Sequence, residues 1–257
     1  MVKCNDCSSG REKYCWNKGR CDTCNGVYLN GGKSYGGYAT YHRAPSHFVL
    51  KILGRLDPAH AAPMLCGGIT TYAYLKDNGC GPGKRVGIVG IGGLGHFGIL
   101  WARALSAEKI VGISRKGSKR AGVLKLGTDE YIATDDEKDW VQKHAATLDL
   151  IICTVSSPTM PLRDCLALLD THGRFIQVGA PEDALPQIRA FDLVAKGKII
   201  GGSSIGSRRQ IEEMLLLAQE KDVRPWVEER PMSEANQATV DMENGLARYR
   251  YTLVNVT

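Results

Sequence analysis

The sequence predicts an α/β fold, in which a doubly wound parallel sheet is accompanied by a smaller β-rich part. From residue 85 onward, short apolar segments alternate with amphipathic ones, as in parallel strands joined by crossover helices. Residues 26–56 are rich in glycine and hold short extended pieces around 38–41 and 48–52, which favours strands connected by loops. With 257 residues, the chain is long enough for one large or two small domains.

The composition excludes several classes of protein. The 43% hydrophobic and 23% charged residues are typical of a soluble globular protein. The net charge of +6 comes without a basic helix or an RNA-binding signature, so we expect no nucleic-acid partner. No apolar run approaches the roughly 18 residues that span a bilayer, and no apolar signal segment follows Met1. We therefore expect a cytoplasmic protein with no membrane partner, whose nine cysteines are thiols or metal ligands.

Five of the nine cysteines lie within the first 24 residues. The spacing Cys4-x2-Cys7-x7-Cys15 allows three thiolates to converge on one tetrahedral zinc ion. Cys21 and Cys24 form a second close pair, either of which could supply a fourth ligand. The alternative is a loop with scattered thiols. We favour a structural zinc lobe, because metal ligation brings order to a segment with little apolar core.

The remaining elements are placed by periodicity and by turn residues. A helix rich in small residues is expected over about 59–78, and a Gly-Pro-Gly turn follows it. The strands of the sheet are predicted at 85–90, 109–114, 149–153, 174–179 and 198–203. Helices are predicted near 94–106, 117–126, 136–146 and 160–169. A helix over 207–220, a helix near 233–245 and a strand at 250–255 complete the chain.

Residues 85–98 carry the strongest chemical signal. A short β-branched strand is followed by Gly90, Gly92 and Gly95 in a G-x-G-x-x-G pattern, and then by a helix with one apolar face. In this context the glycines allow a tight turn, a close approach of the backbone to a pyrophosphate, and close packing of helix on strand. The alternative is a glycine-rich turn in an ordinary βα unit. The context predicts a dinucleotide site whose contacts in the turn are Gly90, Gly92, Gly93, Leu94 and Gly95.

The end of the second strand indicates which dinucleotide binds. Folds that bind NAD usually place an acidic residue about 20 positions after the glycines, where it binds the ribose 2′-hydroxyl. Residues 112–120 contain no acidic residue. Ser114 can hydrogen-bond a 2′-phosphate, and Arg115 and Lys119 can neutralise it. The alternative is a solvated basic turn, but its place beside the expected adenosine ribose predicts NADP(H).

These segments together resemble the medium-chain zinc-dependent dehydrogenases, specifically the NADP(H)-dependent branch that includes cinnamyl alcohol dehydrogenases. The matching runs are 34–38, 61–70, 81–95, 113–115 and 247–254. The resemblance implies a GroES-like catalytic domain split around a Rossmann domain. Residues 1–60 would then be a remnant of the GroES-like domain with the zinc lobe, residues 61–203 the NADP(H)-binding Rossmann domain, and residues 204–257 the return to the catalytic domain.

The resemblance also assigns roles to single positions. Cys4, Cys7 and Cys15 resemble the last three cysteines of the structural-zinc pattern of the family, and Met1 stands in the place of the first. Cys66 resembles a ligand of the catalytic zinc. We expect His60 to be an ordinary helix residue and His96 to lie at the cofactor turn, so neither replaces a catalytic-zinc ligand. Further cofactor contacts are implied at Thr70, Gly179, Ser204, Ile205 and Arg250.

The implied activity is the interconversion of small-molecule alcohols and aldehydes with NADP(H). The resemblance also implies a homodimer formed through the edge of the Rossmann sheet. Family members carry about 100 further residues ahead of Met1, including most catalytic-zinc ligands, so we expect an N-terminally truncated chain with impaired catalysis. The two alternatives are a zinc-independent reductase or cyclase that uses NADP(H), and a non-catalytic NADP(H)-binding protein or partner subunit.

Overall fold

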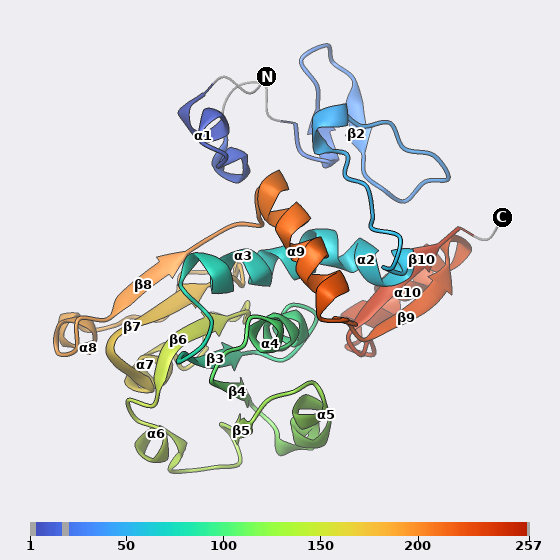
Figure 1. The fold of residues 1–257 in the computed structure, drawn as a ribbon. Coiled ribbons are helices and arrows are strands. Elements are labelled where there is room, and N and C mark those ends of the chain that lie inside the picture. The colour runs from blue at the N-terminus through green and yellow to red at the C-terminus, as the bar shows by residue number, and fades with distance from the viewer. Residues whose placement is uncertain (1–3, 17–20, 256–257) are drawn as a thin grey trace.

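The centre of the molecule is a six-stranded sheet. In the computed structural model, which describes residues 4–16 and 21–255, its strand order is β5-β4-β3-β6-β7-β8 (Figure 1). All neighbouring strands pair in parallel. The strands are β3 (Arg85–Val89), β4 (Lys109–Ser114), β5 (Glu130–Ala133), β6 (Leu148–Cys153), β7 (Leu169–Gln177) and β8 (Ile199–Gly202). The predicted doubly wound parallel sheet is confirmed.

Helices cover both faces of this sheet, which is why its central strands are almost continuously apolar. On one face Val86 and Ile88 belong to a core formed with α3 (Ile69–Asp77), α4 (Gly95–Ala104) and α9 (Arg208–Glu220). The other face packs against α6 (Trp140–Lys143) and α7 (Leu162–Ala167). Two shorter helices, α5 (Arg120–Lys125) and α8 (Ala190–Val194), complete the crossovers. No helix in the described ranges is both long and apolar enough to cross a membrane.

The order of the strands positions the candidate site. From β3 the chain builds outward through β4 to β5, and then returns to the opposite side of β3 to lay down β6, β7 and β8. The direction of winding therefore reverses between β3 and β6. In open parallel sheets, the loops at the carboxyl ends of the strands separate at such a reversal and leave a crevice for a ligand.

The N-terminal part contains little regular structure. It comprises α1 (Asn5–Ser8), a 3₁₀ turn at Glu12–Tyr14, and an antiparallel pair formed by β1 (Cys24–Val27) and β2 (Lys33–Tyr35). The extended pieces expected around 38–41 and 48–52 are not strands, and Ser46–Phe48 forms a 3₁₀ turn instead. Tyr38 and Tyr41 are 75% and 93% exposed, so they lack the packing surface that stabilises a strand.

The segment predicted as one helix over 59–78 is continuous but changes its winding. It runs through α2 (Pro58–Pro63) and a π-helical turn at Met64–Gly68 into α3. The C-terminal part adds β9 (Val227–Pro231), α10 (Ala235–Glu243) and β10 (Arg250–Val254), with β9 and β10 paired in parallel (Figure 1). The Thr252 hydroxyl donates to the carbonyl oxygen of Ala59 at 2.9 Å, which attaches β10 to α2.

Two sequence-based assignments within the sheet need correction. The strand β5 was not predicted, because Glu130–Ala133 is only four residues long and opens with a charged side chain. The strand β7 begins at Leu169 rather than at 174, so the helix before it ends at Ala167. Likewise α6 covers only Trp140–Lys143 of the predicted 136–146, and no further helical residues flank it in this stretch of the described chain.

Candidate cofactor and metal sites

The turn after β3 is shaped by its glycines. Gly90 has a φ of +85°, in the region that glycine adopts without steric cost. A Cβ on Gly95 would collide with the carbonyl oxygen of Gly90, so α4 can begin directly against the strand only with glycine there. By contrast, a Cβ on Gly92 would have no atom within 4 Å. The backbone at Gly92 therefore borders open space, which a phosphate could approach closely.

The carboxyl ends of β3 and β6 are tied together beneath this turn. The Thr154 hydroxyl lies 2.7 Å from the carbonyl oxygen of Gly90 and 3.2 Å from that of Val89, and it can donate to either. A Cβ on Gly90 would lie 2.7 Å from Cγ2 of Val155. Both contacts come from residues that follow β6 directly. They fix the glycine turn at the point where the direction of winding reverses.

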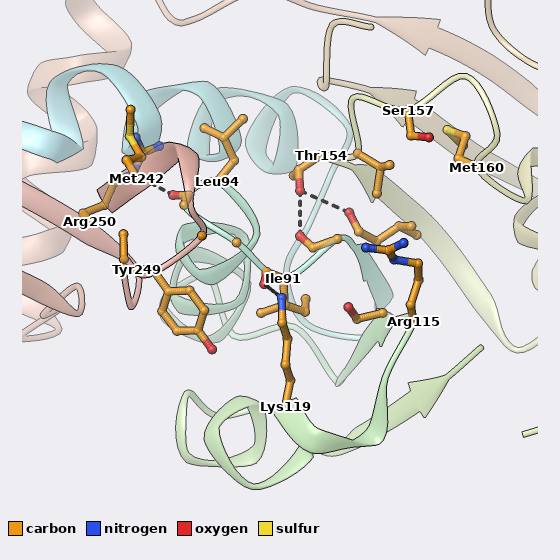
Figure 2. A pocket seen from close by; sticks show the side chains of 18 of the residues that line it. Ile91, Leu94, Arg115, Lys119, Thr154, Ser157, Met160, Met242, Tyr249 and Arg250 are labelled. Atoms are coloured by element: carbon orange, nitrogen blue, oxygen red, sulfur yellow. Dashed lines mark hydrogen bonds between the residues drawn. The ribbon is translucent and has the colours of Figure 1, made fainter. Parts of the chain in front are cut away.

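A cavity of about 1200 Å³ opens at this point, larger than the roughly 300–1,000 Å³ typical of small-molecule sites (Figure 2). It extends from the carboxyl ends of β3, β4 and β6 to α10 and β10. The cofactor residues predicted from the sequence that line it are Gly90, Gly92, Gly93, Leu94, Ser114, Arg115, Lys119 and Arg250. The structure thus brings the glycine turn and the predicted 2′-phosphate residues to one cavity.

Cations gather at the β4 end of the cavity. The Lys119 ammonium donates to the carbonyl oxygen of Ile91 at 3.1 Å (Figure 2). Burial, and secondarily the positive charges of Arg248 and Arg115, lower the pKa of Lys119 from its usual value. A bound anion would offset both effects, because it supplies an opposite charge to partly desolvated cations. This end of the cavity is therefore suited to a phosphate.

A second positive charge reaches the glycine turn from the far end of the sequence. Nε of Arg250, at the start of β10, donates to the carbonyl oxygen of Gly93 at 3.0 Å. A Cβ on Gly67 would collide with this guanidinium group, and a Cβ on Gly93 would lie 2.9 Å from its Nε. The guanidinium therefore fits between two glycines. Its burial lowers the pKa of Arg250, although the group remains a cation at neutral pH.

Four predicted cofactor residues do not line the cavity. The Thr70 hydroxyl donates to the carbonyl oxygen of Cys66 at 2.7 Å. Gly179 is buried, and a Cβ there would collide with the backbone of Val155. Ser204 and Ile205 are exposed, and Ile205 has a φ of +35°. Their roles at the cofactor stay predictions.

Other lining residues escaped the sequence analysis. They include Thr154, Trp140, Met242, Tyr249 and Tyr251. Thr154 carried a usable signal, since a polar residue directly after a buried strand of a parallel sheet lies at the ligand-binding edge. Tyr249 and Tyr251 lie within the run 247–254 that carried the family resemblance. Nothing in the local sequence indicates that they reach a turn more than 150 positions earlier.

Three cysteines of the N-terminal lobe converge as predicted. The sulfur atoms of Cys4, Cys7 and Cys15 all lie within 4.8 Å of one another, and those of Cys4 and Cys15 are 3.7 Å apart. With a Zn–S bond of about 2.3 Å, the sulfur atoms of a tetrahedral site are separated by about 3.8 Å. The neighbouring thiols Cys4 and Cys15 raise the pKa of Cys7 to about 12. These three thiols could hold a zinc ion as thiolates.

The predicted fourth ligand is not brought to this group. The Cys21 sulfur lies 3.6 Å from the carbonyl oxygen of Asp22, and the Cys24 sulfur lies beside Gly36. Among the residues that the structure describes, neither joins the three converging cysteines. Met1, which the resemblance aligns with the first zinc ligand, lies outside the described residues.

Cys66, the predicted catalytic-zinc ligand, is exposed in the π-helical turn. In the described chain it belongs to no group of three side chains close enough to share a metal ion. His60 lies on α2, 3.8 Å from Asp57, and His96 is fully buried beneath the glycine turn, with Nδ1 3.3 Å from the carbonyl oxygen of Gly92. Both therefore lie where the sequence analysis expected them. The residues described at Cys66 do not form a catalytic metal site.

Comparison with known proteins shows the family. Residues 93–220 match the profile of the zinc-binding dehydrogenases. NADP-dependent alcohol dehydrogenase 6 of Saccharomyces cerevisiae is 40% identical over 257 residues, which cover 98% of this chain and 70% of that protein. The chain belongs to the medium-chain zinc-dependent alcohol dehydrogenase family. The family resemblance stated from the sequence is thereby confirmed.

Other members of this family are similar to the chain in sequence or in structure. The 8-hydroxygeraniol dehydrogenase of Catharanthus roseus is 38% identical over 254 residues, covering 98% of this chain and 69% of that protein. A cinnamyl alcohol dehydrogenase structure from Sorghum bicolor matches with a TM-score of 0.91 and 33% identity, covering 98% of this chain and 71% of that one. The structure of CAD from Helicobacter pylori, complexed with NADP(H), matches with a TM-score of 0.82 and 25% identity over 98% of this chain and 71% of that one.

Proposed function

We propose that this chain binds NADP(H) in the cavity and serves as an NADP(H)-dependent oxidoreductase acting on alcohols and aldehydes. The observation that carries the proposal is that Ser114, Arg115 and Lys119 line the same cavity as the glycine turn. The acidic residue nearest this basic turn, Asp135, lies 3.2 Å from Lys116 and is paired with it. The positive charges of Arg115 and Lys119 therefore remain available to a 2′-phosphate.

The residues of the chain divide the binding of the cofactor between them. In the proposed complex the backbone at Gly92 approaches the pyrophosphate, and Arg250 neutralises part of its charge. Ser114, Arg115 and Lys119 hold the 2′-phosphate. Bound NADPH would supply a hydride to a carbonyl carbon, and NADP⁺ would accept one from an alcohol. Because Cys66 has no second metal ligand within reach among the described residues, we derive no step through a catalytic zinc.

The isolation of Cys66 favours a second candidate function. The chain would then use NADP(H) without a catalytic metal, either in a zinc-independent reduction or cyclisation, or as a non-catalytic NADP(H)-binding protein. Both candidate functions share the cofactor cavity and differ only at Cys66. We also propose that the domain limits expected from the sequence, with residues 61–203 as the cofactor-binding unit, apply to this chain.

The experiment follows NADPH consumption by the purified chain with aromatic and aliphatic aldehydes, in the presence of added zinc or of a chelator. Binding of NADPH and NADH is measured in parallel by calorimetry. Turnover that is lost both on chelation and in Cys66→Ser supports the zinc-dependent oxidoreductase. Turnover that survives both treatments supports the zinc-independent enzyme, and tight binding of NADPH without turnover supports the binding protein. Failure to bind NADPH would reject every form of the proposal.

A further inference from the structure

We propose that Tyr249 is a positioning residue for NADP(H) binding, because its buried ring holds the Arg250 guanidinium at the glycine turn. The inference rests on the proposed function, since it needs a cofactor pyrophosphate at that turn. Tyr249 and Arg250 enter the cavity from the same C-terminal segment, and Figure 2 shows their side chains leaving it in opposite directions.

The ring of Tyr249 is enclosed between two other rings. It stacks on His96, in the first turn of α4, with a centroid distance of 5.2 Å and an interplanar angle of 13°. On Trp226 the corresponding values are 5.6 Å and 28°. The Tyr249 backbone N–H also donates to the carbonyl oxygen of Trp226 at 3.1 Å. Only 8% of Tyr249 remains exposed, so the residue has little freedom to move.

The far end of the ring reaches α5. The Tyr249 hydroxyl oxygen lies 3.8 Å from the position that a Cβ on Gly122 would occupy. Tyr249 therefore fills the space between the first turn of α4, which follows the glycine turn, and α5, which follows Lys119. A side chain in this place attaches the C-terminal segment to the elements that flank both phosphate-binding ends of the cavity.

Anchoring Tyr249 fixes the direction of its neighbour. Successive side chains of an extended chain point to opposite sides, so a ring buried on one side directs Arg250 to the other. There the guanidinium group enters the slot between Gly67 and Gly93. Within the described residues, its hydrogen bond to protein involves Nε alone, with the carbonyl oxygen of Gly93 as acceptor. The two terminal nitrogens are left to donate to an anion at the turn.

The anchor depends on packing rather than on a polar contact. No hydrogen bond from the Tyr249 hydroxyl is found in the described part of the chain, and Nε2 of His96 is buried without a partner there. Removing the hydroxyl should therefore cost little, whereas removing the ring opens a cavity beside Arg250. This difference predicts that the conservative variant Tyr249→Phe behaves like the unmodified protein.

The test compares two ligands by calorimetry. NADPH carries the pyrophosphate, whereas adenosine 2′-monophosphate carries only the end of the cofactor that Arg115 and Lys119 are proposed to hold. We expect Tyr249→Leu to weaken NADPH binding about tenfold, the equivalent of one lost charge-assisted hydrogen bond, and to leave binding of the monophosphate unchanged. Tyr249→Phe should leave both affinities unchanged. A loss of equal size for both ligands in Tyr249→Leu would overturn the inference.

A double-mutant cycle tests whether Tyr249 acts through Arg250. Arg250→Gln should weaken NADPH binding by itself, and adding Tyr249→Leu should weaken it no further. Additive losses would contradict the inference. Tyr72→Leu is the matched control, because Tyr72 is a buried aromatic residue that packs on Trp101 and does not line the cavity. It should lower the melting temperature without changing the affinity for NADPH.

Two further measurements keep the outcomes distinct. If Tyr249→Leu does not fold, Trp226→Leu takes its place, since Trp226 is 36% exposed and contacts the other face of the same ring. It should weaken NADPH binding in the same selective way, and an unselective effect would again overturn the inference. If the unmodified protein binds neither ligand, the proposed function fails before any variant is compared.

Discussion

Lys119 shows how one residue can favour NADP(H) over NAD(H). Its ammonium group is partly buried near two arginines and has a carbonyl oxygen as its hydrogen-bond partner. A carboxylate contact to Lys119 is not found among the described residues. A cation in this state gains most from a dianionic 2′-phosphate and little from a ribose hydroxyl.

Lys119→Met should therefore change the preference between the two cofactors. We expect the affinity for NADPH to fall about tenfold or more, because one charge-assisted contact to the phosphate is lost, with little change for NADH. Competition binding with both cofactors measures the ratio. Lys125→Met is the matched control, since Lys125 is an exposed lysine of α5 that does not line the cavity. Equal losses for NADPH and NADH would contradict this role of Lys119.

His96 gives the molecule a pH-dependent stability. Burial, and secondarily the positive charge of Arg250, lower the pKa of His96 from 6.5 to about 4. Between these values an unfolded chain takes up a proton at this position and the folded protein does not. The folded state is therefore favoured above pH 6.5 and loses stability as the pH falls toward 4.

The expected contribution of His96 over this pH range is about 3 kcal/mol. Denaturant unfolding of the protein and of His96→Leu, at several values between pH 7 and pH 4, measures the difference. The variant should lose less stability than the unmodified protein over this range. Carboxylates such as Asp149 contribute to both slopes and cancel in the comparison. Parallel slopes would mean that His96 is already protonated or solvated in the folded state.

Among the elements, those with a local signal were predictable from the sequence. The glycine turn, its strand and its helix appear together because each requires particular residue types, and the basic turn at Ser114, Arg115 and Lys119 follows from its distance along the chain. The short strand β5 could not be predicted, since Glu130–Ala133 becomes a strand only through pairing with β4. The beginning of β7 at Leu169 likewise depends on a register shift against β6 rather than on a pattern of its own.

The cysteine lobe is an element whose structure a metal ion would complete. It docks on the main body through the turn that leads to Cys15, where the Tyr14 and Ser203 hydroxyl oxygens are 2.6 Å apart and Glu12 accepts from the backbone N–H of Arg208 at 2.7 Å. Disorder in the lobe would therefore also release the segment between β8 and α9.

We expect the protein to bind about one zinc ion and Cys7→Ser to lose it, because fewer than three thiolates would remain in the described group. Metal analysis measures the zinc content, and hydrogen exchange at residues 203–208 measures the release of the docked segment. Cys80→Ser is the control, as Cys80 is a cysteine outside the group. Full zinc content in a Cys21→Ser/Cys24→Ser double variant would exclude this pair as the source of a fourth ligand.

At the scale of the whole molecule, one edge of the sheet is exposed. The strand β8 has a neighbour on only one side, and Phe191, Val194 and Ile199 near it are 76%, 69% and 47% exposed. An unpaired strand edge with apolar neighbours favours association with another strand. We propose that two copies of the chain pair here, as expected from the sequence.

Sedimentation analysis should then show a dimer, and Ile199→Lys should shift it to a monomer without changing NADPH affinity. Leu124→Lys is the control, because Leu124 is a 43% exposed apolar residue on α5, a helix on the other side of the sheet. A monomer in the unmodified protein, or a dimer that both variants leave intact, would rule out this interface.

Contacts between distant parts of the chain were the ones that the sequence could not predict. The resemblance indicated that Arg250 binds a phosphate, but its slot is formed by Gly67 and Gly93, and its neighbour Tyr249 packs on His96 and Trp226. Such contacts depend on where β10 lies relative to α4. No periodicity within either segment encodes that placement.

The reversal of winding between β3 and β6 also has a consequence for engineering. The residues proposed to distinguish the two nicotinamide cofactors all follow β4, whereas Thr154 and Val155, which brace the turn, follow β6 on the other side of β3. The two sets belong to separate loops, so one can be redesigned while the other is left unchanged. Grafting an acidic turn over residues 114–119 should therefore reprogramme the choice of cofactor without rebuilding the rest of the cavity.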